Sequence, residues 1–307
     1  MNIFVVGSIN MDLVINTAIM PKEGETLSGN GFFTNPGGKG ANQAVSISKM
    51  NGNALMVGCV GKEFGIELLQ TLNKYKVNTN FVKKNENISS GVAVIVLSNN
   101  DNRIILDAGA NYEITKDDVD KALKTAKQGD YVLLQLEIPL DIVLYTLKKG
   151  KELGLKTVLN TAPAKDLSKD TFKYIDLIIT NQSEANYYTD IYPSDEKTAL
   201  EAACKLANLG VKEVIITLGS KGSTYFDGKE IHSVNAFKEN VVDTTSAGDT
   251  YIGCLLTKLQ NGLSMVEAMK CASAAAAICV TRKGAQMSIP FYDEVDNYLE
   301  THTCKKN

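Results

Sequence analysis

Short apolar runs recur along the chain and are separated by segments with helical spacing. Six runs are continuous: 2–7 (NIFVVG), 54–60 (ALMVGCV), 131–137 (YVLLQLE), 156–160 (KTVLN), 176–180 (DLIIT) and 213–219 (EVIITLG). Strands that helices bury on both faces have this character. The segments between them, such as 63–75 and 139–154, place apolar residues at helical intervals. This alternation predicts an α/β fold with a doubly wound, mainly parallel sheet.

Two segments, 12–34 and 91–110, instead alternate apolar and polar residues around turn-forming residues. They predict β-hairpins inserted into the α/β body, the second with its turn around Asn99–Asn102. A small sheet made of both would be a lid over the carboxyl ends of the main strands, where open α/β sheets bind ligands. The chain has no Pro- or Gly-rich linker and no repeat, so we expect one domain over residues 1–307 that carries this lid.

Composition excludes some classes of function. The 307 residues include 32 Lys and Arg against 35 Asp and Glu, a formal net charge of −3 that does not favour nucleic acid or a membrane as partner. No apolar run approaches the roughly 20 residues of a membrane span. The amino-terminal segment does not resemble a signal peptide, and the six cysteines show no C-x-x-C spacing, so we expect reduced thiols in a cytoplasmic protein.

Several catalytic classes lack their residues. Only His232 and His302 are present, which disfavours a Ser-His-Asp hydrolase or a His-ligated zinc enzyme. No G-x-x-x-x-G-K-[ST] motif occurs, and residues 29–34 (GNGFFT) lack the third glycine of a dinucleotide fingerprint.

Polar residues gather where the predicted strands end. NPGGKGANQA (35–44) allows a ligand close to the backbone, although a turn followed by a helix cap would look the same. Asn10 and Asp12 follow the first strand and could bind a polyhydroxy compound or cap a turn. Glu137 ends a predicted strand and would point into the crevice or serve a helix first turn.

Two further strand ends and the start of one helix carry candidate chemistry. Asn181 and Glu184 share a helix face and could form a capping box or hold a hydrated Mg²⁺. TLGSKG (217–222) suits a phosphate-contacting loop or a hairpin turn. In VVDTTSAGDT (241–250), Asp249 sits at the mouth of a helix, where an anion and a carboxylate compete for the same N–H groups. Asp249 is therefore either a cap or a base aimed at a bound group.

Seven segments together carry a resemblance: GSINMD (7–12), GGKGANQA (37–44), LQLE (134–137), TNQSE (180–184), TLGSKG (217–222), DTTSAGDT (243–250) and VTRKGAQ (280–286). In order and approximate spacing, they resemble the ribokinase-like, or phosphofructokinase-B type, carbohydrate kinases. The similarity runs from residue 3 to about residue 295. The GGKGAN and D-T-x-x-A-G-D motifs are its most specific parts.

The resemblance implies a role for each matching residue. Sugar-binding residues would be Asn10, Asp12, Gly38, Lys39, Gly40, Asn42 and Glu137. The ATP side would comprise Asn181, Thr217, Leu218, Gly219, Ser220, Lys221, Gly222, Gly248 and Ser273, the last at a position where relatives often have histidine. Glu184 would bind Mg²⁺ through water. A K⁺ site built largely of backbone carbonyls would involve Asp243, Thr245, Cys279, Arg282, Gly284 and Ser288.

The implied activity is ATP-dependent phosphorylation of D-ribose at its 5-hydroxyl, with Mg²⁺ and K⁺ as cofactors. Asp249 would be the base, with the N–H groups of Ala247, Gly248 and Asp249 as anion hole. An unperturbed aspartate, with a pKa of about 3.9, would be ionised at neutral pH. Relatives pair through their lids, which implies a homodimer. A kinase for deoxyribose, a nucleoside or another sugar is an alternative, as is a non-catalytic sugar-binding regulator.

Overall fold

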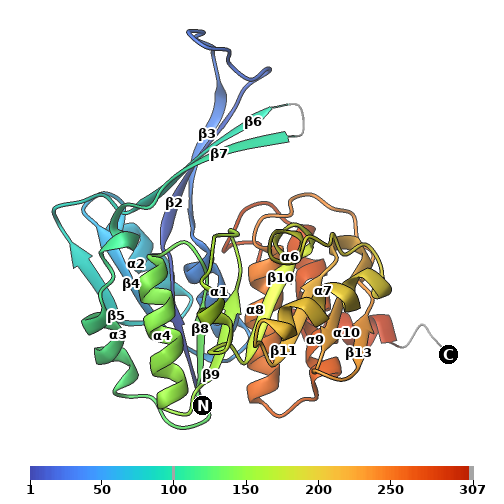
Figure 1. The fold of residues 1–307 in the computed structure, drawn as a ribbon. Coiled ribbons are helices and arrows are strands. Elements are labelled where there is room, and N and C mark those ends of the chain that lie inside the picture. The colour runs from blue at the N-terminus through green and yellow to red at the C-terminus, as the bar shows by residue number, and fades with distance from the viewer. Residues whose placement is uncertain (99–100, 304–307) are drawn as a thin grey trace.

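The computed structural model describes residues 1–98 and 101–303, which form a helix-covered sheet and a smaller projecting sheet (Figure 1). Within these residues, the main sheet has nine strands in the order β13-β12-β11-β10-β9-β8-β1-β4-β5. Its strands from β5 to β11 are parallel, and β12 and β13 pair antiparallel at one edge. Their bounds are β1 (Asn2–Val6), β4 (Asn53–Gly61), β5 (Asn78–Asn85), β8 (Tyr131–Leu134), β9 (Lys156–Asn160), β10 (Leu177–Asn181), β11 (Glu213–Thr217), β12 (Ser223–Phe226) and β13 (Ile231–Val234). The predicted doubly wound, mainly parallel sheet is confirmed.

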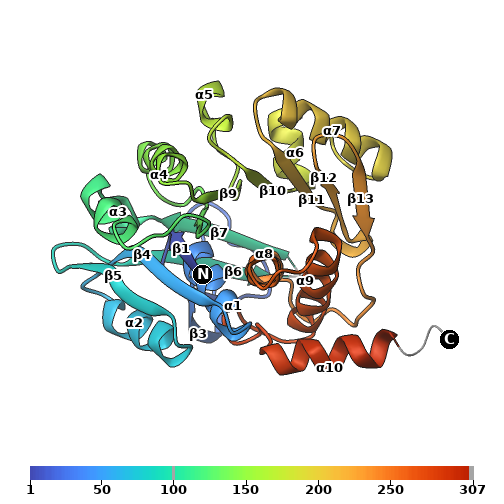
Figure 2. The same ribbon diagram turned by 90° about the horizontal axis from the view of Figure 1, so that it is seen from below.

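Helices cover both faces of this sheet (Figure 2). Alternate residues of β1 serve the two cores: Ile3 and Val5 pack with α1, α2, α8, α9 and α10, and Phe4 and Val6 pack with α3 to α7. The continuous apolar runs of the sequence follow from this burial on both faces. The helices are α1 (Lys39–Lys49), α2 (Gly65–Lys74), α3 (Lys116–Leu123), α4 (Leu140–Glu152), α5 (Lys169–Phe172), α6 (Gln182–Thr189), α7 (Glu196–Asn208), α8 (Ala247–Gln260), α9 (Met265–Val280) and α10 (Tyr292–Thr303).

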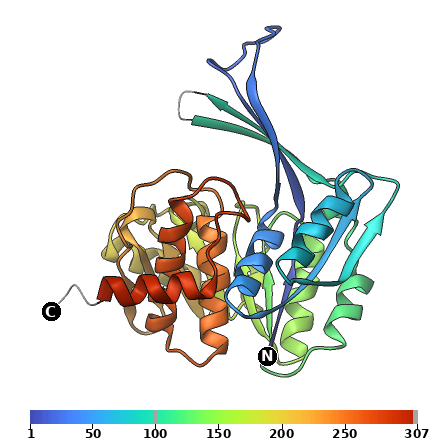
Figure 3. The same cartoon turned by 180° about the vertical axis from the view of Figure 1, so that it is seen from behind.

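The second sheet projects from the carboxyl ends of the main strands (Figures 1 and 3). Its order is β3-β2-β6-β7, with bounds β2 (Asn10–Asn16), β3 (Asn30–Gly37), β6 (Gly91–Ser98) and β7 (Asp101–Asp107). β2 pairs antiparallel with β3 and parallel with β6, and β6 pairs antiparallel with β7. The two predicted lid segments thus form one sheet, although its first strand begins at residue 10 rather than 12. The turn predicted around Asn99–Asn102 includes residues 99 and 100, which lie outside the described residues.

Three strands of the main sheet, β5, β12 and β13, do not stand out in the sequence. β5 (NTNFVKKN) is a half-buried edge strand, so it has no continuous apolar run. β12 and β13 have four residues each. The predicted strand 131–137 is also shorter than expected, since β8 ends at Leu134 and Glu137 lies in the loop beyond it.

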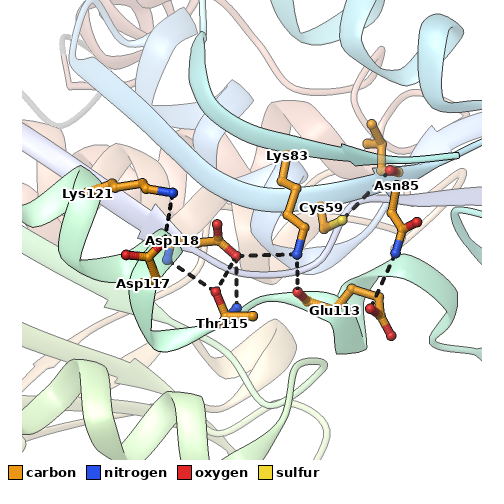
Figure 4. A network of polar contacts seen from close by, with 9 residues as sticks. Cys59, Lys83, Asn85, Glu113, Thr115, Asp117, Asp118 and Lys121 are labelled. Carbon is orange, nitrogen blue, oxygen red and sulfur yellow. Dashed lines mark hydrogen bonds and ion pairs between the residues drawn. The ribbon is translucent and has the colours of Figure 1, made fainter.

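A polar network ties the edge strand β5 to the segment that precedes α3 (Figure 4). The Lys83 ammonium donates to the backbone carbonyl of Glu113 (3.0 Å) and lies 3.7 Å from the Asp118 carboxylate. Thr115 and Asp118 form the capping box that begins α3. These bonds fix the short 3₁₀ helix η1 (Gly109–Glu113), which lies next to the base of the projecting sheet.

The five cysteines in the described part of the chain are free thiols, and Cys304 lies outside it. Among the helices of residues 1–98 and 101–303, none combines the length and the apolar character needed to cross a bilayer.

Candidate active site

A cavity of about 230 Å³ opens at the carboxyl ends of β9, β10 and β11, beside the first turn of α8. Parallel strands that end together create such a crevice, and open α/β sheets bind their ligands there. The lining residues include Lys39, Asn160, Thr180, Asn181, Glu184, Thr217, Thr244, Ser246, Gly248 and Asp249. Six of these (Lys39, Asn181, Glu184, Thr217, Gly248 and Asp249) were candidates from the sequence, so residues up to 210 positions apart meet at one site.

The first turn of α8 presents unpaired N–H groups to this cavity. Ser246 precedes the helix with a left-handed backbone (φ 62°). The N–H groups of Gly248 and Asp249 have no acceptor among the described residues, whereas Ala247 N–H donates to the carbonyl of Thr244 (3.2 Å). The anion hole expected from three N–H groups therefore has two free donors, since the Ala247 N–H is already engaged. A helix amino terminus with free N–H groups attracts anions.

Asp249 is held by two amides of α1. Asn42 Nδ2 donates to Asp249 Oδ2 (3.0 Å), and Gln43 Nε2 donates to Oδ1 (2.9 Å). Burial raises the pKa of Asp249 above its usual value, and Lys39 and the two amides act in the opposite direction. The sequence alone predicts an unperturbed pKa for Asp249, because it does not show how deeply the carboxylate is buried, whereas burial raises this pKa. A raised pKa makes Asp249 a stronger proton acceptor.

Gln43 belongs to a chain of buried amides that the sequence analysis missed. Gln135 Nε2 donates to Gln43 Oε1 (2.6 Å), and Gln43 Nε2 also donates to Asn160 Oδ1 (3.1 Å). These hydrogen-bonded amides connect Asp249 to the ends of β8 and β9. Two signals were available: Gln43 lies inside GGKGANQA, and Asn160 ends a predicted strand just as the strand-end candidates do.

α1 and α8 approach each other closely behind Asp249. An ideal Cβ on Gly253 would lie 2.4 Å from the Cβ and Oγ of Ser46. Ser46 Oγ also donates to the carbonyl of Thr250 (2.9 Å). A glycine is therefore required here, and the close approach brings the α1 amides within hydrogen-bonding reach of Asp249.

Lys39 begins α1 and lines the cavity. Burial alone would lower its pKa, but the nearby carboxylates of Asp249, Glu137 and Glu184 raise it overall. No carboxylate of the described chain lies within ion-pair distance of its ammonium. The charge of Lys39 is therefore free to interact with an anion in the cavity.

The other predicted sugar-side residues lie around the base of β2, next to the cavity. Asn10 Oδ1 accepts from Asn111 Nδ2 (2.6 Å), and Asn111 Oδ1 accepts from the Ile9 N–H (2.8 Å). Glu137 Oε2 accepts from Ser8 Oγ (2.5 Å) and from the Lys39 N–H (3.2 Å). Asn111, which comes from η1, was not predicted, and no motif in the sequence points to it.

Asp12 is a buried carboxylate that accepts no hydrogen bond from the described residues. Burial raises its pKa to about 7, and the negative charges of Glu137 and Asp249 add to the effect. A buried carboxylate without donors is costly. Hydroxyl groups of a bound ligand would supply the missing donors.

Gly38 and Gly40 have no side chains that could bind a sugar. Close approach of the surrounding backbone explains why both positions are glycine. Gly38 has φ 89°, and an ideal Cβ on it would lie 2.7 Å from the Asn10 backbone nitrogen. A Cβ on Gly40 would lie 2.7 Å from the backbone of Gly7. Both glycines therefore allow the start of α1 to pack against the start of β2, where the sugar-side residues are.

Asn181 and Glu184 form the capping box of α6 and also line the cavity. Glu184 Oε2 accepts from the Asn181 N–H (3.0 Å) and from Thr161 Oγ1 (3.2 Å). Burial raises the pKa of Glu184, and these donors oppose that effect. The described residues contain no group of three or more His, Cys, Asp or Glu side chains that could enclose a metal. Mg²⁺ keeps several of its waters and binds through one or two carboxylates, so the Glu184 carboxylate at the cavity is compatible with the predicted water-mediated contact.

The 217–222 segment joins β11 to β12 as a hairpin connection that contains the 3₁₀ helix η2 (Gly219–Lys221). Thr217 lines the cavity, and the Leu218 N–H donates to the carbonyl of Gly222 (2.7 Å). Ser220 and Lys221 are exposed, and the Lys221 ammonium donates to the carbonyl of Ser194 (2.7 Å). Neither they nor the buried Ser273 of α9 lines the cavity, so their assignment to ATP remains a prediction.

The predicted K⁺ residues lie together, except for one side chain. Asp243 Oδ1 accepts from the Thr245 N–H (2.9 Å), and Oδ2 accepts from the Gly284 N–H (3.0 Å). Burial opposes a low pKa for Asp243, but these hydrogen bonds outweigh it and the pKa is lowered. Cys279 Sγ lies 3.1 Å from Ser288 Oγ and 3.7 Å from the carbonyl oxygen of Thr245.

The exception is Arg282, whose guanidinium pairs with Glu294 (2.5 Å) on α10. Only its backbone is available to a cation site. The 243–246 and 282–289 loops are joined by the Gly284–Asp243 hydrogen bond and by the contacts of Cys279, just before the start of α8. Backbone carbonyl oxygens are ligands that hard cations accept.

Comparison with known proteins gives a consistent result. Residues 1–291 match the family model described as pfkB family carbohydrate kinase. The chain is 41% identical to a ribokinase of Schizosaccharomyces pombe, over 100% of this chain and 99% of that protein. It is 38% identical to a deoxyribokinase of Salmonella typhi, over 97% and 99%. The structure of Arabidopsis thaliana ribokinase complexed with ribose and ATP superposes with a TM-score of 0.90 at 32% identity, covering 97% of this chain and 98% of that one.

Proposed function

The chain belongs to the pfkB family of carbohydrate kinases, and we propose that it transfers the γ-phosphoryl group of ATP to the 5-hydroxyl of D-ribose. Ribokinases 35–41% identical over nearly the whole chain support this activity. The observation that carries the mechanism is the first turn of α8: the Asp249 carboxylate and the free N–H groups of Gly248 and Asp249 belong to one helical turn beside one cavity.

In the proposed mechanism the ribose hydroxyl lies between Asp249 and the transferred phosphoryl group. Asp249 orients this hydroxyl and accepts its proton as the bond to phosphorus forms. The N–H groups of Gly248 and Asp249 bind the phosphoryl oxygens, and the Lys39 ammonium offsets their charge. Asn10, Asp12 and Glu137 would bind the other ribose hydroxyls. The ADP that leaves would remain on the side of Asn181 and Thr217.

Two cations complete the proposal. Mg²⁺ would be held through water by Glu184, and it neutralises phosphate charge when bound. K⁺ would be held by carbonyl groups of the 243–246 and 282–289 loops. We expect activity to rise when K⁺ replaces Na⁺ at constant ionic strength, and equal activity in the two salts would remove K⁺ from the proposal. The use of ATP is also consistent with the expected cytoplasmic location.

A homodimer through the projecting sheet is also proposed. This sheet exposes large apolar side chains on β3, β6 and β7: Phe32, Phe33, Val94, Ile104, Ile105 and Leu106. Ile105 alone is 72% exposed. Exposed apolar strands in contact with water favour pairing with another surface. A second copy of the same sheet would cover them.

Turnover across a panel of pentoses tests the function. ADP release is measured by a coupled assay with D-ribose, deoxyribose, other sugars and nucleosides. We expect the highest kcat/KM with D-ribose. The deoxyribokinase at 38% identity makes deoxyribose the second candidate, and a higher kcat/KM with it would replace ribose as the substrate. Absence of turnover with every sugar, in a folded protein that binds ribose, would favour the non-catalytic alternative.

A further inference from the structure

α1 ends in a buried lysine that the proposed chemistry does not use. Lys49 is 4% exposed, and its ammonium donates to the backbone carbonyls of Gln286 (2.9 Å) and Ile289 (2.7 Å). The same nitrogen lies 4.3 Å from the ring centroid of Tyr75 and 4.8 Å from that of Phe291. No carboxylate of the described residues lies within ion-pair distance of it. A buried ammonium needs compensation, and here carbonyl dipoles and aromatic faces provide it.

The carbonyl groups that Lys49 holds belong to the 282–289 loop, which braces the start of α8. In this loop, Gly284 N–H donates to Asp243, and Ser288 Oγ contacts Cys279 Sγ, which in turn contacts the Thr245 carbonyl. Thr245 lies three residues before Gly248, where the free N–H groups of α8 begin. A continuous set of contacts therefore leads from Lys49 to the groups that would bind the phosphoryl oxygens.

The opposite end of α1 contacts the same site from the other side. Asn42 and Gln43 hold Asp249, and Lys39 lines the cavity. α1 packs along α8 (Figure 2). α1 thus contacts Asp249 near its amino end and the 282–289 loop at its carboxyl end. Burial lowers the pKa of Lys49 to about 8, so the side chain is still mostly charged at neutral pH.

We propose that Lys49 is a positioning residue whose ammonium acts as a fixed internal cation. It holds the 282–289 loop against the 243–246 loop, and so aligns the N–H groups of Gly248 and Asp249. The exchangeable K⁺ would bind carbonyl groups of the same two loops. The two cations therefore stabilise one loop arrangement, and loss of one increases the dependence on the other. The catalytic part of this inference rests on the proposed kinase function.

The first test is a K⁺ titration of ribose-dependent turnover at constant ionic strength. Lys49→Met removes the charge and leaves two carbonyls unpaired, whereas Lys49→Arg keeps the charge. Couplings between sites usually amount to a factor of about 5–150. We therefore expect Lys49→Met to raise the half-saturating K⁺ concentration about tenfold or more while the ribose KM changes less than about twofold. Lys49→Arg should stay close to the wild type.

Lys258 provides a matched control. It is a buried lysine of α8, its ammonium lies 4.1 Å from the ring centroid of Tyr292, and it holds no carbonyl of the 282–289 loop. Lys258→Met should leave the K⁺ titration unchanged. A wild-type K⁺ curve in Lys49→Met, or the same shift in Lys258→Met, would overturn the proposal.

A second measurement does not require activity. Hydrogen–deuterium exchange of the full-length protein without substrates should be faster over residues 282–289 in Lys49→Met and unchanged there in Lys258→Met. If the wild type shows no ribose turnover or ignores K⁺, the proposed function fails, and the exchange rates alone decide whether Lys49 braces the loop. Unchanged exchange in Lys49→Met would reject the bracing role. If Lys49→Met does not fold, Lys49→Gln, which donates hydrogen bonds without charge, takes its place in both measurements.

Discussion

Replacement of Asp249 by asparagine separates a base from a helix cap. The amide has nearly the same shape as the carboxylate, but it lacks the charge and the proton acceptor. In Asp249→Asn an NH₂ group replaces one of the two carboxylate oxygens. This NH₂ group would face a donor, either Asn42 Nδ2 or Gln43 Nε2. Asn42 Oδ1 is buried and has no partner in the described chain, so a flip of the Asn42 amide restores the lost hydrogen bond. The variant should therefore fold.

The size of the effect follows from the role that is removed. General-base assistance contributes about 10²–10⁴-fold to a rate, which corresponds to about 2.7–5.4 kcal/mol in the activation free energy. We expect kcat of Asp249→Asn to fall by at least about 10²-fold. Ribose and ATP should still bind, because the free N–H groups and the sugar-side residues are unchanged. The loss should appear in kcat and kcat/KM and not in KM.

Asp195 supplies the matched control for this experiment. It is the N-cap of α7, where its carboxylate accepts from the Thr198 N–H (2.8 Å). Asparagine caps a helix about as well as aspartate, so Asp195→Asn should keep wild-type kcat. Steady-state ADP release at saturating ribose and ATP compares the two variants. Asp249→Asn with more than about a tenth of wild-type kcat would refute the role of base, given the lower bound of that range.

Three further predictions concern other parts of the molecule. Burial raises the pKa of Asp12 to about 7. If ribose hydroxyls donate to the ionised carboxylate, the apparent ribose KM should rise about tenfold from pH 8 to pH 6, because the ionised fraction falls. A ribose KM that is independent of pH, or unchanged in Asp12→Ala, would contradict this role. Ile105→Glu places a charge on the exposed apolar strand β7 and should convert a dimer to a monomer in sedimentation velocity at micromolar concentration; a wild-type sedimentation coefficient would count against pairing through this sheet. Asp176 accepts from Lys151, Lys212 and Thr157, which outweigh burial and lower its pKa, so Asp176→Asn should lower the free energy of unfolding by about 3 kcal/mol at pH 7. Because this stabilisation is present above the unfolded pKa of about 3.9 and is lost as the pH falls through the lower folded pKa, the difference in urea unfolding should shrink below about pH 4, and an equal difference at pH 3 and pH 7 would disprove the ionic origin.

The sequence predicted those parts of the fold that burial determines. Continuous apolar runs identified β1, β4, β9, β10 and β11 closely, because strands covered on both faces contain few polar residues. Edge strands escape this rule, and β5 was missed for that reason. The alternation of apolar and polar residues identified the two segments that form the projecting sheet. Which of their apolar side chains stay exposed became clear only from the structure.

The candidate site was predictable in its members but not in its contacts. Motifs and strand ends pointed to Asn42 and Asp249, but a hydrogen bond between residues 207 positions apart depends on how two helices pack. The raised pKa of Asp249 was missed for the same reason, since burial is a property of the folded chain. Asn111 left no trace in the sequence, because a lone asparagine in a 3₁₀ helix matches no periodic pattern or motif.

The contact between Gly253 and Ser46 has a practical consequence for changing the specificity of this protein. It determines how closely α1, which carries the amides of Asn42 and Gln43, packs against α8, which carries the Asp249 carboxylate. Residues on β2 or in the loop after β8 can be randomised for new sugars while this spacing is kept. A methyl group at Gly253 would instead lie 2.4 Å from the Cβ and Oγ of Ser46 and 2.9 Å from the backbone oxygen of Gln43, so α1 and α8 would have to move apart. Libraries that vary the sugar-side residues should therefore keep Gly253 and Ser46 unchanged. In a separate experiment, side chains of increasing size at Ser46 would change the distance between the α1 amides and Asp249 without altering any residue that is proposed to contact the substrate.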